Sequence, residues 1–169
     1  PTYQHFLYMM YHYTMDSERK LHYAASKSDT KELRDYFEHM AKEERGHYII
    51  AQRDYEEFGL VINDKDIPKP VSDFNKFWYT LGNNDCNEFI GALFVFESVS
   101  DLVGKQVVEL IKRLNLTKKQ SRWLTVHAEA DHEHGDEAKE MCIKYGPRNP
   151  TAIISAAEKA TEMWCGVFR

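Results

Sequence analysis

Three ionisable side chains, His127, Asp131 and His134, share one face of a predicted helix in the segment WLTVHAEADHEHGDEAKEM. At about 100° per residue they fall within roughly 60° of arc. The same stripe is apolar above and below them, which predicts that it is buried. A carboxylate beside two imidazoles is costly to bury unless a metal ion compensates both its charge and its hydrogen bonding. The spacing therefore favours a metal site, with a hydrogen-bonded cluster of buried His and Asp as the alternative.

A second motif, EERGH, places Glu44 and His47 three residues apart on a predicted helix. Side chains at this spacing are neighbours on one helix face, so both can bind the same metal ion. Carboxylate-bridged di-iron bundles use this ExxH arrangement. Glu43, four residues before His47, competes as the ligand. We prefer Glu44 because it matches the bundle motif.

Single acidic residues on two predicted helices complete the pattern. Glu97 interrupts the apolar run GALFVFES, and a lone carboxylate there needs a partner. Asp101, one turn later, is either an acceptor that orients a ligand or a displaced ligand. Asp54, seven residues after His47, could also orient a ligand, and the alternative is a surface acid near a helix end. We expect Glu97 to be the ligand on its helix.

Together these motifs supply three carboxylates and three imidazoles. Two divalent ions would leave such a cluster almost neutral and keep coordination positions open. Nitrogen and oxygen donors without thiolate suit iron or manganese and argue against a closed structural zinc site. The predicted metal ligands are therefore six residues on three helices: Glu44, His47, Glu97, His127, Asp131 and His134.

Helical periodicity dominates the chain and predicts an all-α bundle of about six helices in a single domain. Capping signals support several of the starts, namely Asp29 with Glu32, Thr117 with Gln120, and Asn149 with Pro150. A connector ending in IPKP separates the second and third helices. The expected helices span about residues 2–26, 29–59, 71–81, 87–114 and 117–145, with the last beginning at 150.

Composition excludes several classes of function. The 169 residues carry a net charge of -5 and no cluster of Lys and Arg interleaved with aromatics, which argues against a nucleic-acid partner. No apolar run approaches the roughly 20 residues needed to span a bilayer, so we expect no membrane partner. Cys86, Cys142 and Cys165 lack metal or redox spacing. Reduced thiols and the absence of a signal-peptide pattern indicate a cytoplasmic protein.

Three segments, EERGHYIIAQRDYEEFGL, GALFVFESVS and VHAEADHEH, resemble a known family over most of the chain. It is that of the heme-oxygenase-like di-iron oxidases and oxygenases, often labelled iron-containing redox enzymes. The resemblance implies a compact helical bundle in which the six residues above bind two Fe(II) ions, with Mn an option in one site. Dioxygen would be the co-substrate in the oxidation of a small organic substrate such as an amine, an amino acid or a fatty acid.

The first predicted helix departs from this family. Some members have a further acidic ligand there, whereas this chain has FLYMMYHYT without a carboxylate. His12 could substitute for it, and a structural or pocket-lining role is the alternative. We therefore expect one iron to bind firmly and the other more weakly. Four aromatic residues could face the metals: Tyr8, Tyr11, Tyr48 and Trp123.

Two rival functions remain open. The first is a metal-binding or ferroxidase-like protein that stores or senses metal without an organic substrate. The second is heme binding or degradation, with His5 or His12 as an axial ligand. The heme hypothesis leaves the acidic residues on three helices unexplained. As partners we allow for a homodimer and for an external electron donor.

Overall fold

The computed structural model describes residues 2–169, except the side chains of residues 100–103, 105 and 129–133. This described part contains helices and no strand, which confirms the all-α prediction, but eight α-helices replace the expected six. The elements are α1 (Thr2–Thr14), α2 (Ser17–Lys27), α3 (Lys31–Glu43), α4 (His47–Glu56), α5 (Lys69–Trp78), α6 (Asn87–Arg113), α7 (Arg122–Tyr145), a short 3₁₀ helix (Gly146–Arg148) and α8 (Pro150–Val167).

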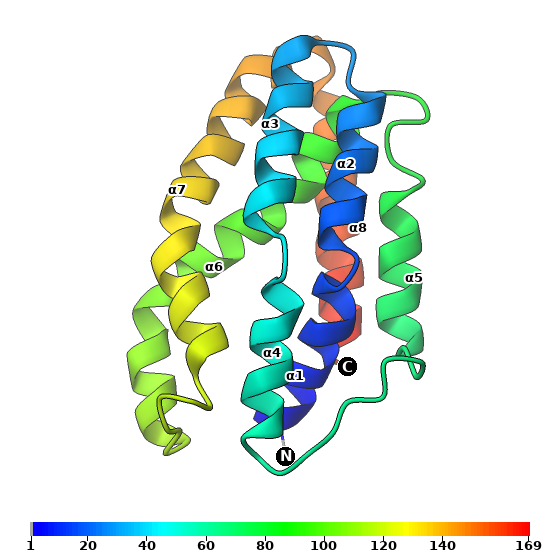
Figure 1. Cartoon of the computed structure of the whole chain (residues 1–169). Coiled ribbons are helices and arrows are strands. Elements are labelled where there is room, and N and C mark those ends of the chain that lie inside the picture. The colour runs from blue at the N-terminus through cyan, green and yellow to red at the C-terminus, as the bar shows by residue number, and fades with distance from the viewer. Residues whose placement is uncertain (1) are drawn as a thin grey trace.

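Two of the predicted long helices are each broken into two. The first breaks between α1 and α2, where Asp16 takes the position before the first residue of α2. The second breaks between α3 and α4, where Gly46 has φ of +83°, a left-handed conformation that favours glycine. Figure 1 shows both breaks near the middle of the bundle, with α2 and α3 above α1 and α4. The breaks account for the two extra helices.

Helix starts agree with the capping signals only in part. Asn149 accepts a hydrogen bond from the Ala152 amide at the start of α8, as the Asn-Pro pair predicts. Thr30, not Asp29, caps α3 by accepting from the Leu33 amide. Thr117 and Gln120 do exchange hydrogen bonds. That pair forms only a turn, because α7 begins later, at Arg122.

The helices pack in pairs around a largely aromatic core. α6 runs between α7 and α8 and packs against both, while α2 packs against α3 and α1 against α4. Phe37, Phe74 and Phe89 are completely buried in this core. Gly91 brings α6 close to α8, since a Cβ there would lie 2.1 Å from the Ile153 carbonyl oxygen. The central position of α6 places Glu97 in the interior.

No helix in the described part of the chain has both the length and the apolar character required to cross a membrane.

Candidate metal centre

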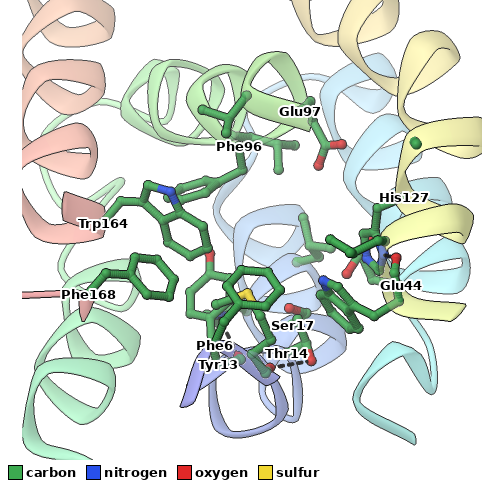
Figure 2. Close-up of a pocket in the computed structure, with 18 of the residues that line it drawn as sticks. Phe6, Tyr13, Thr14, Ser17, Glu44, Phe96, Glu97, His127, Trp164 and Phe168 are labelled. Atoms are coloured by element: carbon green, nitrogen blue, oxygen red, sulfur yellow. Dashed lines mark hydrogen bonds between the residues drawn. The ribbon is translucent and has the colours of Figure 1, made fainter. Parts of the chain in front are cut away.

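A cavity of about 340 Å³ lies inside the bundle, within the range of about 300–1,000 Å³ typical of small-molecule sites. Figure 2 shows Glu44, Glu97 and His127 on one side of it and a group of aromatic rings on the other. The described residues that line it are mainly apolar: Phe6, Met10, Tyr13, Thr14, Ser17, Lys20, Leu21, Glu44, Trp78, Leu93, Phe96, Glu97, Val99, Val107, Trp123, Leu124, His127, Ala128, Trp164 and Phe168.

Glu44 and His47 meet at the break between α3 and α4. Glu44 follows the last residue of α3 and His47 is the first residue of α4, so the two do not share one continuous helix as expected. The turn through Gly46 nevertheless brings His47 Nδ1 to 3.2 Å from Glu44 Oε1, with both side chains about 15% exposed. Glu43 is exposed at the surface. Of the two competing glutamates, Glu44 is therefore the one that faces the cavity.

The charge of Glu44 responds to three histidines. Burial acts to raise the pKa of its carboxyl group, but a hydrogen bond from His47 and the nearby charges of His47, His127 and His134 outweigh this effect. The pKa of Glu44 therefore lies below its usual value. One of these histidines lies on α4 and the other two lie on α7. The carboxyl group of Glu44 is therefore close enough to interact with histidines of both predicted motifs.

Glu97 and His134 form a second buried pair between α6 and α7. Glu97 Oε2 lies 3.5 Å from His134 Nδ1, and both side chains are 9% exposed. The next residue, Gly135, faces the α6 backbone at this level, since a Cβ there would lie in ordinary van der Waals contact with the Glu97 carbonyl oxygen, at 3.4 Å. The partner that a lone carboxylate on α6 requires is thus an imidazole from α7.

His127 lies on α7, seven residues before His134, and is fixed in orientation. Its Nδ1 is 2.8 Å from the Trp123 carbonyl oxygen, one turn earlier on α7. Because a carbonyl only accepts, Nδ1 carries the proton, and in the neutral ring Nε2 carries the lone pair. The Trp123 ring stacks on the imidazole at 3.9 Å between centroids, and His47 lies 5.0 Å away between centroids. This is the arrangement that orients a metal-binding histidine.

Asp54 ties α4 to the start of α7. It is completely buried, which excludes the alternative of a surface acid. Its Oδ2 accepts a hydrogen bond of 2.8 Å from the Trp123 amide, in the first turn of α7. Ser121, which precedes α7, makes no capping bond with its own side chain. Burial raises the pKa of Asp54 to about 6. Asp54 thus caps α7 at Trp123, the residue whose carbonyl oxygen is bonded to His127.

Two predicted site residues, Asp131 and Asp101, lie outside the described side chains. Among the side chains that are described, no three His, Cys, Asp or Glu residues converge closely enough to hold a metal ion. The described part of the site thus consists of the pairs Glu44 with His47 and Glu97 with His134, together with His127.

The first-helix candidates lie away from the cavity. His12 is buried but borders a separate hollow near Asp16 and Tyr79, and His5 is exposed. Trp123 is the only one of the four proposed aromatic residues among the described residues lining the cavity. Tyr8 and Tyr11 pack against His12 instead, and Tyr48 packs against Tyr11.

Sequence reasoning missed three polar residues of the cavity wall, Thr14, Ser17 and Lys20. They lie at or just after the break between α1 and α2. A signal for two of them was present, because Ser17 and Lys20 share helical spacing with Leu21 and Ala24, which are buried. Lys20, like Glu97, is a charged residue on a largely apolar, buried helix face.

Comparisons with known proteins identify the family and the fold of the chain. The family described as iron-containing redox enzymes matches residues 4–165, so the chain belongs to that family. Its fold is heme-oxygenase-like. A solved domain of unknown function with a heme oxygenase-like fold, from Shewanella denitrificans OS217, is similar with a TM-score of 0.86 and 17% identity, over 99% of this chain and 75% of that one. No curated protein matches the sequence. The resemblance found in the sequence is thereby confirmed.

Proposed function

We propose that the protein is a non-heme di-iron oxidase or oxygenase that uses dioxygen to oxidise a small organic substrate. The observation that carries this proposal is the position of Glu44, Glu97 and His127, which face one cavity whose other walls are aromatic. Each glutamate has a histidine beside it. The iron-containing family supplies the identity of the metal.

The donor set fits iron. The described donors are imidazole nitrogen and carboxylate oxygen, and His127 is oriented through its Nδ1 with its lone pair on Nε2. In the proposed assignment, Asp131 joins Glu44, His47, Glu97, His127 and His134 as ligands of two iron ions, with Mn as an option in one site. When bound, the metal ions would supply the electrons and the binding positions needed to activate dioxygen.

The chain's own residues would prepare the substrate. Phe96, Trp164 and Phe168 provide aromatic walls that bind an apolar body and exclude water. Asp54 binds the Trp123 amide at the start of α7, and the carbonyl oxygen of the same residue orients His127. The aromatic cavity beside the ligands favours an organic substrate over the metal-storage alternative. The heme alternative gains no support, since His5 and His12 do not line this cavity.

Glu44→Gln and Glu43→Gln form a matched pair that tests the ligand assignment. Elemental analysis of protein loaded with ferrous iron under anaerobic conditions should show that E44Q loses iron while E43Q keeps the wild-type content. Oxygen uptake with candidate substrates should fall in E44Q alone. Helical circular dichroism verifies that both variants fold. Full iron content in E44Q, or loss of iron in E43Q, would contradict the assignment.

The absence of a carboxylate on α1 predicts unequal iron sites. Titration of the metal-free protein with ferrous iron should give one tight and one weaker binding step. His127→Ala should abolish binding while leaving the helical circular dichroism largely unchanged. Two equally tight sites would disprove the expected inequality, and full iron content in the His127 variant would disprove the site itself.

A further inference from the structure

Lys20 is a buried cation in the wall of the cavity. The residue is 2% exposed and lies in the first turns of α2. Its Nζ lies 3.7 Å from the centroid of the Tyr13 ring and 5.7 Å from that of Trp78, and both rings line the cavity. The ammonium group therefore lies among the aromatic side chains that would surround a substrate.

The partners of Lys20 carry no charge. Nζ donates to the Tyr13 carbonyl oxygen at 3.3 Å and to Asn75 Oδ1 at 3.0 Å. No described carboxylate forms an ion pair with Nζ. Asp16 is instead engaged by Arg19 at 2.7 Å and by the Tyr79 hydroxyl at 2.8 Å. Burial lowers the pKa of Lys20 to about 7, although Asp16 and Glu44 act from a distance in the opposite sense.

A buried charge is expensive unless an opposite charge compensates it. A lysine kept on the wall of an apolar cavity without a paired carboxylate thus offers a binding position for an anion. One ammonium group balances one negative charge, so a monoanion fits better than a phosphate dianion. Ser17, three residues before Lys20 on α2, also lines the cavity and adds a hydroxyl near this position.

We propose that Lys20 binds the carboxylate of an apolar organic substrate, whose body lies in the aromatic part of the cavity. This inference rests on the proposed function and narrows its substrate to an organic acid. Held at Lys20, the carboxylate would be bound by the protein itself, and the apolar body would extend through the cavity that Glu44, Glu97 and His127 also line.

Intrinsic fluorescence provides a direct assay, because all three tryptophans of the chain, Trp78, Trp123 and Trp164, line the cavity. Octanoate and octanamide have the same chain and differ in charge. Wild-type protein should bind octanoate about tenfold or more tightly than octanamide, since a charge-assisted hydrogen bond separates them. Octylamine, a cation of the same length, should bind more weakly than either. Equal affinity for octanoate and octanamide would overturn the inference without any variant.

Lys20→Met should remove the preference for octanoate while keeping the affinity for octanamide. Lys27→Met is the matched control, because Lys27 lies on the same helix over the Tyr23 ring, at 5.4 Å, but is exposed. K27M should keep the wild-type preference. If K20M fails to fold by circular dichroism, Lys20→Gln takes its place. A preference for octanoate that survives both substitutions of Lys20 would overturn the inference.

Metal content separates this inference from the proposed function. The titrations are performed with the protein loaded with ferrous iron under anaerobic conditions and again after treatment with EDTA. A preference present in both states and lost in K20M supports Lys20 even if the protein turns over no dioxygen. A preference that disappears with EDTA and persists in K20M would show that a metal ion, not Lys20, holds the carboxylate.

Discussion

Glu44 and Glu97 each lie beside a histidine in the cavity wall, whereas Lys20, in the same wall, has only uncharged oxygen atoms as hydrogen-bond partners. Both regions are buried, so the difference lies in how charge is compensated. Each of these carboxylates has an imidazole nitrogen within 3.5 Å. Lys20 has no such partner among the described residues. This contrast is the basis of the two proposals, a metal site in the first region and an anion site at Lys20.

The largest effect is expected from breaking the carboxylate and imidazole region. Glu97→Gln removes a proposed ligand and leaves His134 without its carboxylate, so affinity for ferrous iron should fall by more than the roughly 10–100-fold typical of lost outer contacts. Anaerobic equilibrium titration measures this change. Glu109→Gln, on the exposed surface of the same helix, is the control and should bind iron normally. Unchanged affinity in E97Q would place the metal elsewhere.

The next largest effect is expected at Asp54, which holds the start of α7, the helix that carries His127 and His134. Asp54→Ala leaves the buried Trp123 amide without its acceptor and the start of α7 without a cap, which should cost about 1–3 kcal/mol of unfolding free energy. Urea denaturation measures it. Asp54→Asn keeps an acceptor and should recover most of the loss. Equal destabilisation by both variants would show that charge, and not capping, is what Asp54 provides.

Lys20 should make the stability of the folded protein depend on pH. Its pKa is about 7 in the folded protein and near 10.5 when exposed, so the unfolded chain binds more protons between these values. Stability therefore rises with pH in this window, by on the order of 1–2 kcal/mol from about pH 7 to 8.5. Denaturation curves for wild type and K20M measure the difference. If the unfolding free energy of K20M rises with pH as much as that of the wild type, a group other than Lys20 causes the rise.

The smallest effect is expected at the edge of the first region. Arg122 Nε lies 3.5 Å from Asp54 Oδ1, but the arginine side chain is 37% exposed. Exposed ion pairs contribute about 1 kcal/mol or less. Arg122→Met should therefore change the unfolding free energy by no more than this amount in urea denaturation. A loss as large as that of D54A would mean that Asp54 depends on the guanidinium group for its role.

The sequence was informative wherever a polar residue interrupted an apolar stripe. Glu97 and His134 were singled out on this ground, and both are buried and adjacent. The family followed from the segments that contain these residues, whereas the all-α class followed from helical periodicity. Asp54 shows the limit of the approach, because spacing alone could not distinguish a buried cap of another helix from a surface acid. That distinction depends on α7, which begins sixty-eight positions later (122 minus 54).

The sequence by itself determined the helical class of this protein, the kinds of donor atoms it contains and their spacing within each motif, because helical periodicity and side-chain chemistry are local properties. Tertiary structure decided the two breaks, the pairing of Glu97 with His134 and the placement of Lys20 among Tyr13 and Trp78. Helical periodicity continues through both breaks, so the pattern alone does not show where each helix ends, although glycine at position 46 permits the left-handed turn. The two breaks, at Asp16 and Gly46, are also where Ser17 and Glu44 enter the cavity wall.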